Sequence, residues 1–476
     1  AINAAAFRLW SWNQSKIVNR KSKIVNQNPI FADYHFAIMK ISYNWLKQFI
    51  QTDKTPQELS LILTNIGLEV ESLEKVQAII GPRRVGKTSA MLLAIEELKT
   101  TRGISPGQII YFNFEDERIQ FEPHQLDLII QAWQELNLEI KLENAWFFFD
   151  EVQAAPGWER FLNRINETWS KKIFFTGSNS SVLHTELKSV LRGRSIAIEL
   201  LPLSFKEYCE FSNFKPSAYG LGKSKTIALF HKYLVHGGYP ETINLPSQHI
   251  RLAYLQEYYN AMLLRDIVEY NQLSNYTYLR SLYRQAASTI GKTISNRRLY
   301  NQLKSQQYSV GINSIYEAMD MAEQAYLFKR ISRFDYSDSK REKSDKKIYW
   351  LDNGLLNANT AQYTGNNGLL LENLVFKELY LKFGSIYTNN IYYYAEPAGE
   401  CDFVIYPEGG IALPVQVSWT LTDPDTRSRE IKGLLKAAIY CKVKEAWIIT
   451  LDEEEELTID GIHIQIMPAW KWMSQA

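Results

Sequence analysis

The chain has few cysteines, no long apolar run and almost no net charge, and each absence argues against a class of protein. Its three cysteines, Cys209, Cys401 and Cys441, are far apart and odd in number, which argues against a disulfide framework or a zinc site. No apolar run reaches the roughly 18 residues that a membrane-spanning helix needs. The N-terminus also lacks the basic-then-apolar pattern of a signal peptide. We therefore expect a cytoplasmic protein with no membrane partner.

The overall composition is that of a folded protein with more than one domain. The net charge is +1, from 53 basic and 52 acidic residues, so no global field draws the chain to nucleic acid. A hydrophobic content of 46% with 13% aromatic residues argues against disorder. Because 476 residues exceed what one ordinary core supports, we expect two or three domains.

The first 75 residues differ in pattern from the rest of the chain. Residues 1–38 contain the sequence SKIVN twice and show no core-forming period, so we expect disorder or translated sequence upstream of a start at Met39. Residues 39–75 are predicted to form a compact segment, with apolar residues at helical spacing and a second helix that ends at Gly67.

Residues 76–205 alternate short apolar runs with stretches of helical spacing. The runs are VQAII (76–80), QIIYFNF (108–114), AWFFFD (145–150), KIFFT (172–176) and SIAIEL (195–200). Apolar runs without polar alternation are typical of central strands that are covered on both faces. Intervening stretches such as 89–99 and 158–169 predict helices. The pattern therefore predicts an α/β domain with a parallel sheet.

The rest of the chain divides into a helical region and a second mixed unit. Residues 206–346 are predicted to be mostly helical, and their charged end, 335–347, is predicted to be an exposed wing or linker. Residues 347–476 are predicted to form an α/β domain. Its strands are expected at 391–396, 401–406, 413–419 and 445–451.

The first apolar run leads directly into GPRRVGKT, which has the form GxxxxGK[ST] between a predicted strand and a predicted helix. Glycines allow such a loop to curl so that backbone N–H groups point at phosphate, and the helix N-terminus adds partial positive charge. Lys87 would bridge the β- and γ-phosphates of ATP, and the Thr88 hydroxyl would bind Mg²⁺. The expected nucleotide-binding residues are Gly81, Pro82, Arg83, Arg84, Val85, Gly86, Lys87, Thr88 and Ser89.

A second acidic motif follows the strand AWFFF. Asp150 would hold the Mg²⁺ shell, and Glu151 is placed to act as the general base on the attacking water. The structural alternative is a solvated strand end. Because an apolar run followed by Asp-Glu agrees with the independent loop motif, we predict an ATPase with Lys87 and Glu151 in catalytic roles.

Two further segments contain candidate catalytic groups. Ser178 follows the strand KIFFT and could contact the γ-phosphate or position water, although Ser178 or Asn179 could instead cap a helix. Arg192 or Arg194 could stabilise transition-state charge, either within the molecule or across a contact in a homo-oligomer. Either arginine could equally be an ordinary surface residue.

The order of the motifs GPRRVGKT, FFFDEVQ, TGSNSS, LRGRS and LPLSFKEY resembles a family of AAA-type ATPases of the ASCE branch of P-loop proteins. The resemblance continues through GGYPE, LLRDIVE, KIYWLDNGLL, LLLENLVFKELY and PVQVSW, over about 400 residues. It implies a winged-helix-like middle region and a C-terminal domain of unknown function with a PD-(D/E)xK nuclease-like fold. Residues 39–76 instead resemble the N-terminus of the phenylalanyl-tRNA synthetase β subunit. The chain therefore resembles a fusion of this synthetase-like segment with the ATPase-like part that follows it.

The nuclease-like resemblance lets us compare the C-terminal domain with a metal-dependent nuclease. Such an enzyme uses acidic residues to hold a metal ion and a lysine to orient water. Glu378 and Asp402 are the candidate carboxylates. The segment Gln416-Val417-Ser418 takes the place of the E/Q-x-K motif of such nucleases, with Ser418 at the position of the lysine. We therefore expect a domain without cleavage activity, and a surface salt-bridge role for the two carboxylates stays open.

The predicted winged-helix-like region offers mixed evidence for DNA binding. A basic stripe contains Lys292, Arg297, Arg298 and Lys304. The segment 313–327, where a recognition helix is expected, is acidic instead, and acidic groups repel phosphate. DNA binding and a packing or partner-binding role therefore both remain open.

Three hypotheses for function remain from the sequence. The first is an ATP-driven switch or motor that acts on nucleic acid or a protein partner. The second is a nucleotide-dependent scaffold without turnover, which Glu151 argues against. The third is an ATPase-coupled DNA endonuclease. Synthetase activity is not expected, because the substrate and tRNA-binding domains that it needs are not present.

Overall fold

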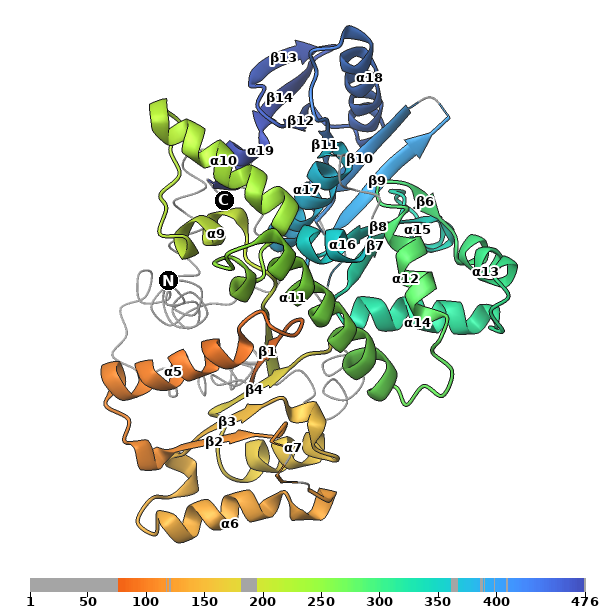
Figure 1. Cartoon of the computed structure of the whole chain (residues 1–476). Coiled ribbons are helices and arrows are strands. Elements are labelled where there is room, and N and C mark those ends of the chain that lie inside the picture. The colour runs from red at the N-terminus through yellow and green to blue at the C-terminus, as the bar shows by residue number, and fades with distance from the viewer. Residues whose placement is uncertain are drawn as a thin grey trace, which may run out of the picture. The chain divides into compact units, whose positions relative to one another are not determined.

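The computed structural model describes residues 76–474 apart from 117, 120, 181–194, 361–366, 386, 387, 389, 398, 408 and 409. The chain divides into two compact units (Figure 1). The N-terminal unit holds the described residues up to Gly81 and then Gly86–Leu200. The C-terminal unit holds Leu201 onward together with Pro82–Val85. The predicted segments 1–38 and 39–75 lie outside the described residues.

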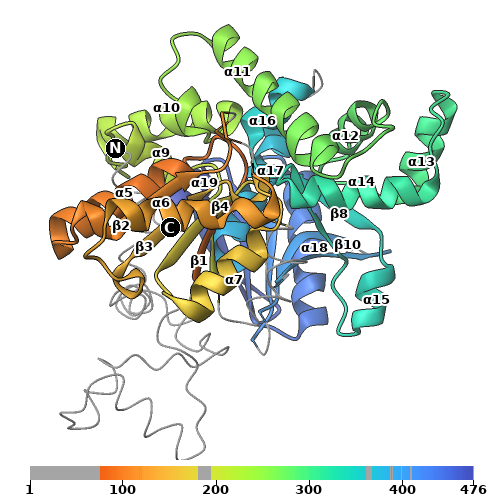
Figure 2. The same ribbon diagram turned by 90° about the horizontal axis from the view of Figure 1, so that it is seen from below.

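The N-terminal unit is built on a parallel five-stranded sheet with strand order β2-β3-β4-β1-β5. Its strands are β1 (Val76–Ile80), β2 (Ile109–Asn113), β3 (Trp146–Asp150), β4 (Ile173–Gly177) and β5 (Ser195–Glu199). The helices are α5 (Lys87–Arg102), α6 (Asp127–Leu136) and α7 (Trp158–Thr168), with short 3-10 turns η2 (Pro106–Gln108), η3 (Pro123–Gln125), η4 (Leu142–Asn144) and η5 (Val152–Ala154). The predicted parallel α/β sheet is confirmed, and its elements can be followed from below in Figure 2.

Helices cover the sheet on both faces, because its central strands carry apolar side chains on both faces. Phe148 of β3 belongs to one cluster with Met91 and Leu98 of α5. The next residue, Phe149, contacts Phe161 of α7, with ring centroids 5.5 Å apart. Since successive side chains of a strand point to opposite faces, α5 and α7 pack on opposite sides of the sheet. This explains why AWFFF lacks the alternation of a half-exposed strand.

The carboxyl ends of three neighbouring strands meet at one edge of this sheet. Strand β4 lies between β1 and β3, with Ile80 paired to Gly177 and Phe149 paired to Phe175. The loop after β1, the acidic pair after β3 and the polar residues after β4 therefore leave the sheet side by side.

The C-terminal unit begins with helices. They are α9 (Phe205–Phe211), α10 (Gly220–His236), the 3-10 turn η7 (Pro240–Thr242), α11 (Gln248–Ala261), the π-helix η8 (Met262–Glu269), α12 (Leu279–Ala287), α13 (Asn296–Ser305) and α14 (Ile312–Gln324). A three-stranded antiparallel sheet of order β6-β8-β7 follows α12 in the chain, with β6 (Thr293–Ile294), β7 (Phe328–Ile331) and β8 (Lys346–Trp350).

The charged stretch 335–347 is not a simple wing or linker. It contains the short helix α15 (Asp338–Lys343) and the start of β8. Arg341 pairs with Asp338 on α15, and pairs three residues apart favour a helix even where no apolar face is buried. Lys347 is fully buried on β8, which a run of charged letters does not reveal.

The last part of the C-terminal unit contains a mixed six-stranded sheet of order β13-β14-β12-β11-β10-β9. Its strands are β9 (Ile391–Glu396), β10 (Gly399–Ile405), β11 (Leu413–Val417), β12 (Glu445–Thr450), β13 (Glu455–Ile459) and β14 (Ile462–Pro468). The associated helices are α16 (Asn353–Asn359), α17 (Asn367–Phe383), α18 (Pro424–Cys441) and α19 (Ala469–Ser474).

Helices cover this second sheet on both faces as well. Val404 of β10 belongs to a core cluster with Leu434 and Ala438 of α18. Its neighbour Phe403 contacts Phe376 of α17, with ring centroids 6.2 Å apart. In the part of the chain that the structure describes, no helix has the length and apolar character needed to cross a membrane.

Candidate nucleotide-binding site

The loop between β1 and α5 needs glycine at two positions. Gly81 has φ 152°, and a Cβ atom there would lie 1.9 Å from the carbonyl oxygen of Leu200. Gly86 has φ 98° and forms the N-cap of α5, where no side chain supplies a capping hydrogen bond. The first backbone N–H groups of a helix have no partner within it, so the start of α5 offers donors to an anion. The loop therefore has the backbone that phosphate binding requires.

Lys87 and Thr88, the first two residues of α5, reach the end of β3. The Lys87 side chain is buried, and its Nζ donates to the Gly81 carbonyl at 3.1 Å and lies 3.3 Å from Glu151 Oε1. The Thr88 hydroxyl donates to Asp150 Oδ2 at 2.7 Å. The structure therefore brings together the lysine, the hydroxyl and both acidic residues that the sequence motifs predict.

Asp150 lies among three hydroxyl groups. Besides Thr88, the Thr176 hydroxyl donates to Asp150 Oδ1 and the Tyr111 hydroxyl donates to Oδ2 at 3.3 Å. Burial, followed by the charge of Asp150 and this hydrogen bond, raises the pKa of Tyr111 to about 12, so the phenol keeps its proton at neutral pH. The sequence prediction missed both Tyr111 and Thr176.

Glu151 is held by its backbone as well as by its side chain. Its φ of 51° and ψ of 52° are left-handed, a conformation that costs a non-glycine residue free energy and that often occurs at functional sites. The Glu151 N–H donates to the Thr176 hydroxyl at 2.8 Å. Gln153 Nε2 donates to Glu151 Oε2 at 2.6 Å and to Ser178 Oγ at 3.1 Å. Ser178 is thus linked to Glu151 through Gln153, which sequence reasoning also missed.

The remaining predicted residues are distributed differently. Ser89 is exposed on the first turn of α5. In the C-terminal unit, Arg83 Nε donates to both Asp266 oxygens, at 2.9 and 3.0 Å, and Arg84 Nη1 lies 3.6 Å from Glu241 Oε2. Pro82 and Val85, before and after them in the chain, are buried.

The arginine hypothesis and the helix-cap alternative are not tested by the described residues. Arg192 and Arg194 lie outside them, as does the segment after Ser180 in which Ser178 or Asn179 would cap a helix.

The oxygen atoms at this site suit a magnesium ion. Mg²⁺ prefers oxygen ligands and is usually held by one or two protein groups together with substrate phosphates. The Thr88 hydroxyl and an Asp150 carboxylate oxygen lie 2.7 Å apart beside the loop. Among the described residues, no group of three or more His, Cys, Asp or Glu side chains is arranged to hold a metal ion.

A second polar cluster lies in the C-terminal unit, around Asp402. Glu378, the other candidate carboxylate, accepts a hydrogen bond from the Phe205 N–H at 3.1 Å. The helix carboxylate that acts on Asp402 is Glu372. Residues six apart on a helix point in different directions, because each residue turns by about 100°.

Lys347 supplies the positive charge of this cluster from β8. Its Nζ lies 2.6 Å from Glu400 Oε1 and 3.6 Å from Asp402 Oδ1. Burial lowers the pKa of Lys347, but the carboxylates of Asp402, Glu372 and Glu400 outweigh burial and raise it. Burial and then the charge of Glu372 raise the pKa of Asp402 well above its usual value. A surface salt bridge does not describe this arrangement, because Lys347 and Asp402 are buried.

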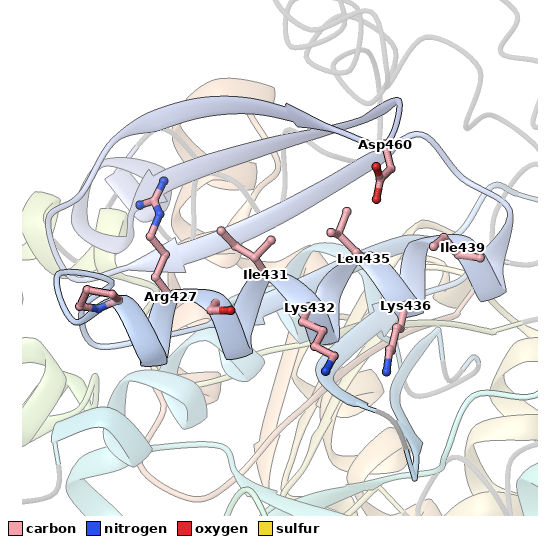
Figure 3. Close-up of a pocket in the computed structure, with 9 residues that line it drawn as sticks. Arg427, Ile431, Lys432, Leu435, Lys436, Ile439 and Asp460 are labelled. Atoms are coloured by element: carbon pink, nitrogen blue, oxygen red, sulfur yellow. The ribbon is translucent and has the colours of Figure 1, made fainter.

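Two acidic residues of the expected recognition helix have a structural partner. Arg330 of β7 lies 2.5 Å from both Asp320 and Glu323 of α14. The members of the predicted basic stripe, Lys292, Arg297, Arg298 and Lys304, lie on and before α13. A separate groove along α18 has Arg427, Lys432 and Lys436 in its lining (Figure 3), and none of the predicted site residues lines it.

Comparison with known proteins agrees with the geometry of the N-terminal unit. Residues 73–209 match the model of an AAA domain. The chain contains an AAA domain. Residues 227–364 match a domain of unknown function, DUF8612. The resemblance inferred from the motif order is therefore confirmed for the AAA domain.

Two relatives align with this AAA-domain protein over most of its length. An uncharacterized protein of Methanocaldococcus jannaschii is 30% identical over 419 residues, which cover 86% of this chain and 90% of that protein. The two belong to one family. An uncharacterized protein of Haemophilus influenzae is 26% identical over 404 residues, which cover 85% of this chain and 96% of that protein.

Other similarities of this AAA-domain protein are shorter or weaker. The phenylalanine–tRNA ligase beta subunit of Bacteroides fragilis is 54% identical over 43 residues, 9% of this chain and 5% of that protein. Among solved structures, Aeropyrum pernix ORC1 in complex with DNA has a TM-score of 0.30 at 12% identity and covers 64% of this chain and 90% of its own. AMPPCP-bound DnaA from Aquifex aeolicus has a TM-score of 0.27 at 16% identity and covers 58% of this chain and 90% of its own.

Proposed function

We propose that this protein is a Mg²⁺-dependent ATPase that works as a switch or motor on nucleic acid or a protein partner in the cytoplasm. The observation that carries the proposal is the convergence of Lys87, Thr88, Asp150 and Glu151 within hydrogen-bond or ion-pair distance of one another. These groups come from two segments more than 60 residues apart in the chain, Thr88 and Asp150 being separated by 62. A loop that only turned the chain would not need them.

The roles of the residues follow from their positions. The backbone amides at the start of α5 bind the phosphates, and Lys87 neutralises charge on the β- and γ-phosphates. Bound Mg²⁺ would add charge neutralisation at the phosphates, with Thr88 and Asp150 as its protein partners. Glu151 accepts a proton from the attacking water. Lys87 lies 3.3 Å from Glu151, so binding of phosphate by Lys87 would also release the base.

Substitution of the base tests this proposal. We expect Glu151→Gln to bind ATP as tightly as the wild type and to lose at least 100-fold in turnover, because general base catalysis typically contributes 10²–10⁴-fold. Steady-state hydrolysis and fluorescent ATP binding measure the two quantities separately. Glu135→Gln, at an exposed position of α6, is the matched control. An unchanged rate in Glu151→Gln would remove the assigned base.

Two alternatives make different predictions in the same experiments. A nucleotide-dependent scaffold would bind ATP without turnover in the wild type. An ATPase-coupled DNA endonuclease would cleave plasmid DNA in Mg²⁺ or Mn²⁺. Ser418 in place of the expected lysine favours a nuclease-like domain without cleavage activity, although Lys347 places an ammonium group beside Asp402.

The partner can be identified with the Glu151→Gln protein, which should stay in the ATP-bound state. Glu151→Gln protein saturated with ATP should hold its partner, and a pull-down in ATP compared with one in ADP would identify it. The basic residues on and before α13 support nucleic acid as one partner class. Sedimentation in ATP and in ADP would test whether a homo-oligomer forms.

A further inference from the structure

Gln153 is a polar side chain to which the proposed mechanism gives no role, although it contacts the proposed base Glu151 and the predicted site residue Ser178. It lies on the single-turn helix η5, which directly follows the left-handed residue Glu151. Its Nε2 donates to Glu151 Oε2 at 2.6 Å and to Ser178 Oγ at 3.1 Å. A primary amide nitrogen has two hydrogens, so both donors of Gln153 are used. One carboxamide thereby fixes the base relative to the residue after β4.

The orientation of this amide is settled by chemistry. An ionised carboxylate can only accept hydrogen bonds, so the group 2.6 Å from Glu151 must be the amide nitrogen. The carbonyl oxygen Oε1 therefore points away from Glu151 and Ser178. This oxygen is buried, and no donor among the described residues reaches it.

A buried acceptor without a donor costs free energy, and such groups in native proteins often have a catalytic role or an ordered water. The backbone holds this acceptor in place. The Ala154 N–H donates to the Glu151 carbonyl and the Ala155 N–H donates to the Val152 carbonyl, both at 3.0 Å. The turn is therefore closed on both sides of Gln153, and its side chain starts from a fixed backbone.

We propose that Gln153 positions the attacking water in ATP hydrolysis, through its carbonyl oxygen Oε1. This inference rests on the proposed ATPase function. The water donates one hydrogen to Gln153 Oε1 and the other to Glu151, so a lone pair of its oxygen is left to face the γ-phosphorus. Glutamine carbonyl groups suit this task because they accept a hydrogen bond without removing the proton.

The chemical step balances with these two residues. The water oxygen forms a bond to the γ-phosphorus. The bond from that phosphorus to the oxygen that bridges to the β-phosphate breaks, and its electron pair leaves with ADP. One water proton passes to Glu151, which later returns it to solvent. The other water hydrogen, which is hydrogen-bonded to Gln153 Oε1, stays on the attacking oxygen and so becomes part of the phosphate product. Gln153 itself is neither protonated nor deprotonated.

Three substitutions of the full-length protein separate positioning from structure. Gln153→Leu keeps a similar volume and cannot hydrogen-bond. Gln153→Glu keeps the acceptor but places a second carboxylate beside Glu151, where like charges repel. Gln153→Asn keeps both functional groups on a side chain that is one methylene shorter. Gln131→Ala, at an exposed position of α6, is the control.

We expect Gln153→Leu to bind ATP within about 3-fold of the wild type and to lose at least 10-fold in kcat, at the lower end of what positioned groups contribute. Gln153→Asn should retain more activity than Gln153→Leu. The acidic limb of the pH–rate profile should move to higher pH in Gln153→Leu, because Glu151 loses a donor to its charged form. A merely structural role would change KM or thermal stability and leave that limb in place.

The outcomes distinguish this inference from the function on which it rests. If the wild type hydrolyses ATP, Glu151→Gln does not, and Gln153→Leu retains wild-type kcat, the inference is wrong and the ATPase proposal stands. If the wild type shows no turnover, both are wrong. If Gln153→Leu does not fold, as judged by its circular dichroism and melting curve, the comparison is made with Gln153→Asn and Gln153→Glu. Wild-type kcat and an unmoved acidic limb in both of these would then overturn the inference.

Discussion

The hydroxyl of Thr176 offers a sharp prediction because it joins the two acidic residues of the site. Its Oγ1 accepts the Glu151 N–H at 2.8 Å and donates to Asp150 Oδ1. Thr176 is fully buried, so no water replaces these bonds if the hydroxyl is removed. Thr176→Val has nearly the same shape and removes only the hydrogen-bonding group, whereas Thr176→Ser keeps it.

The expected magnitude is the sum of the two hydrogen bonds. A bond between neutral groups contributes about 0.5–1.5 kcal/mol and one to a charged group about 1.5–3 kcal/mol. Their loss should therefore reduce the stability of the N-terminal unit by about 2–4.5 kcal/mol. At about 1.4 kcal/mol for each factor of ten, this is roughly a 30-fold to 1,500-fold change in the equilibrium between open and closed states.

Amide hydrogen exchange reports on this unit alone. Peptides that cover β3 and the residues after it should exchange roughly 30-fold to 1,500-fold faster in Thr176→Val, and Thr176→Ser should resemble the wild type. ATP turnover should fall in Thr176→Val as well, because the left-handed backbone at Glu151 loses its hydrogen bond. Exchange in Thr176→Val within about 3-fold of the wild type would show that the hydroxyl does not hold the acidic residues.

Three further predictions concern the C-terminal unit. Lys347→Met should destabilise it by about 3–5 kcal/mol, because the buried Asp402 loses its counter-charge, and chemical denaturation should show no such loss in the exposed control Lys343→Met. Plasmid DNA should stay intact in Mg²⁺ or Mn²⁺, and cleavage that Asp402→Ala abolishes would overturn the expectation of an inactive nuclease-like domain. Burial, with the charges of Arg251 and Lys232, lowers the pKa of His236 from 6.5 to about 4. The unfolded state therefore binds this proton at a higher pH than the folded state, so the free energy of unfolding should fall as the pH is lowered from about 6.5 to 4. His236→Gln should reduce the slope of this pH dependence. An equal slope in the variant and the wild type would refute the assignment.

The parallel sheet and the central site were predictable because their signals are local. Each of the two motifs can be read from fewer than about ten residues. One is a glycine loop between a strand and a helix, and the other is a pair of acidic residues after an apolar run. The second residue of α5 and the last residue of β3 meet because parallel strands end at one edge. No knowledge of side-chain contacts was needed for that step.

The partners of these residues were not predictable in the same way. Thr176 and Gln153 are ordinary polar residues in the sequence, and only the register of β3 and β4 and the left-handed turn at Glu151 bring them together. Tyr111 reaches Asp150 from β2 because these strands are neighbours in the sheet.

Longer-range pairings explain why the contacts in the C-terminal unit were not predictable. Lys347 reaches Asp402 from a strand much earlier in the chain, and the choice between Glu372 and Glu378 depends on the rotation of α17. The hairpin of β13 and β14 did carry a signal. Its Asp460-Gly461 turn has φ values of 52° and 74°, and Asp-Gly between alternating strands is a strong hairpin pattern.

The central claim is that the loop before α5 binds a nucleoside triphosphate together with Mg²⁺. Calorimetric titration of ATP into the full-length protein, with Mg²⁺ and with EDTA, tests it most directly. We expect binding that depends on Mg²⁺, a loss of at least about 10-fold in affinity in Lys87→Ala, and none in Lys99→Ala, which changes an exposed lysine of the same helix. Equal affinity in Lys87→Ala and the wild type, or no Mg²⁺-dependent binding of any nucleoside triphosphate to the folded protein, would contradict the account.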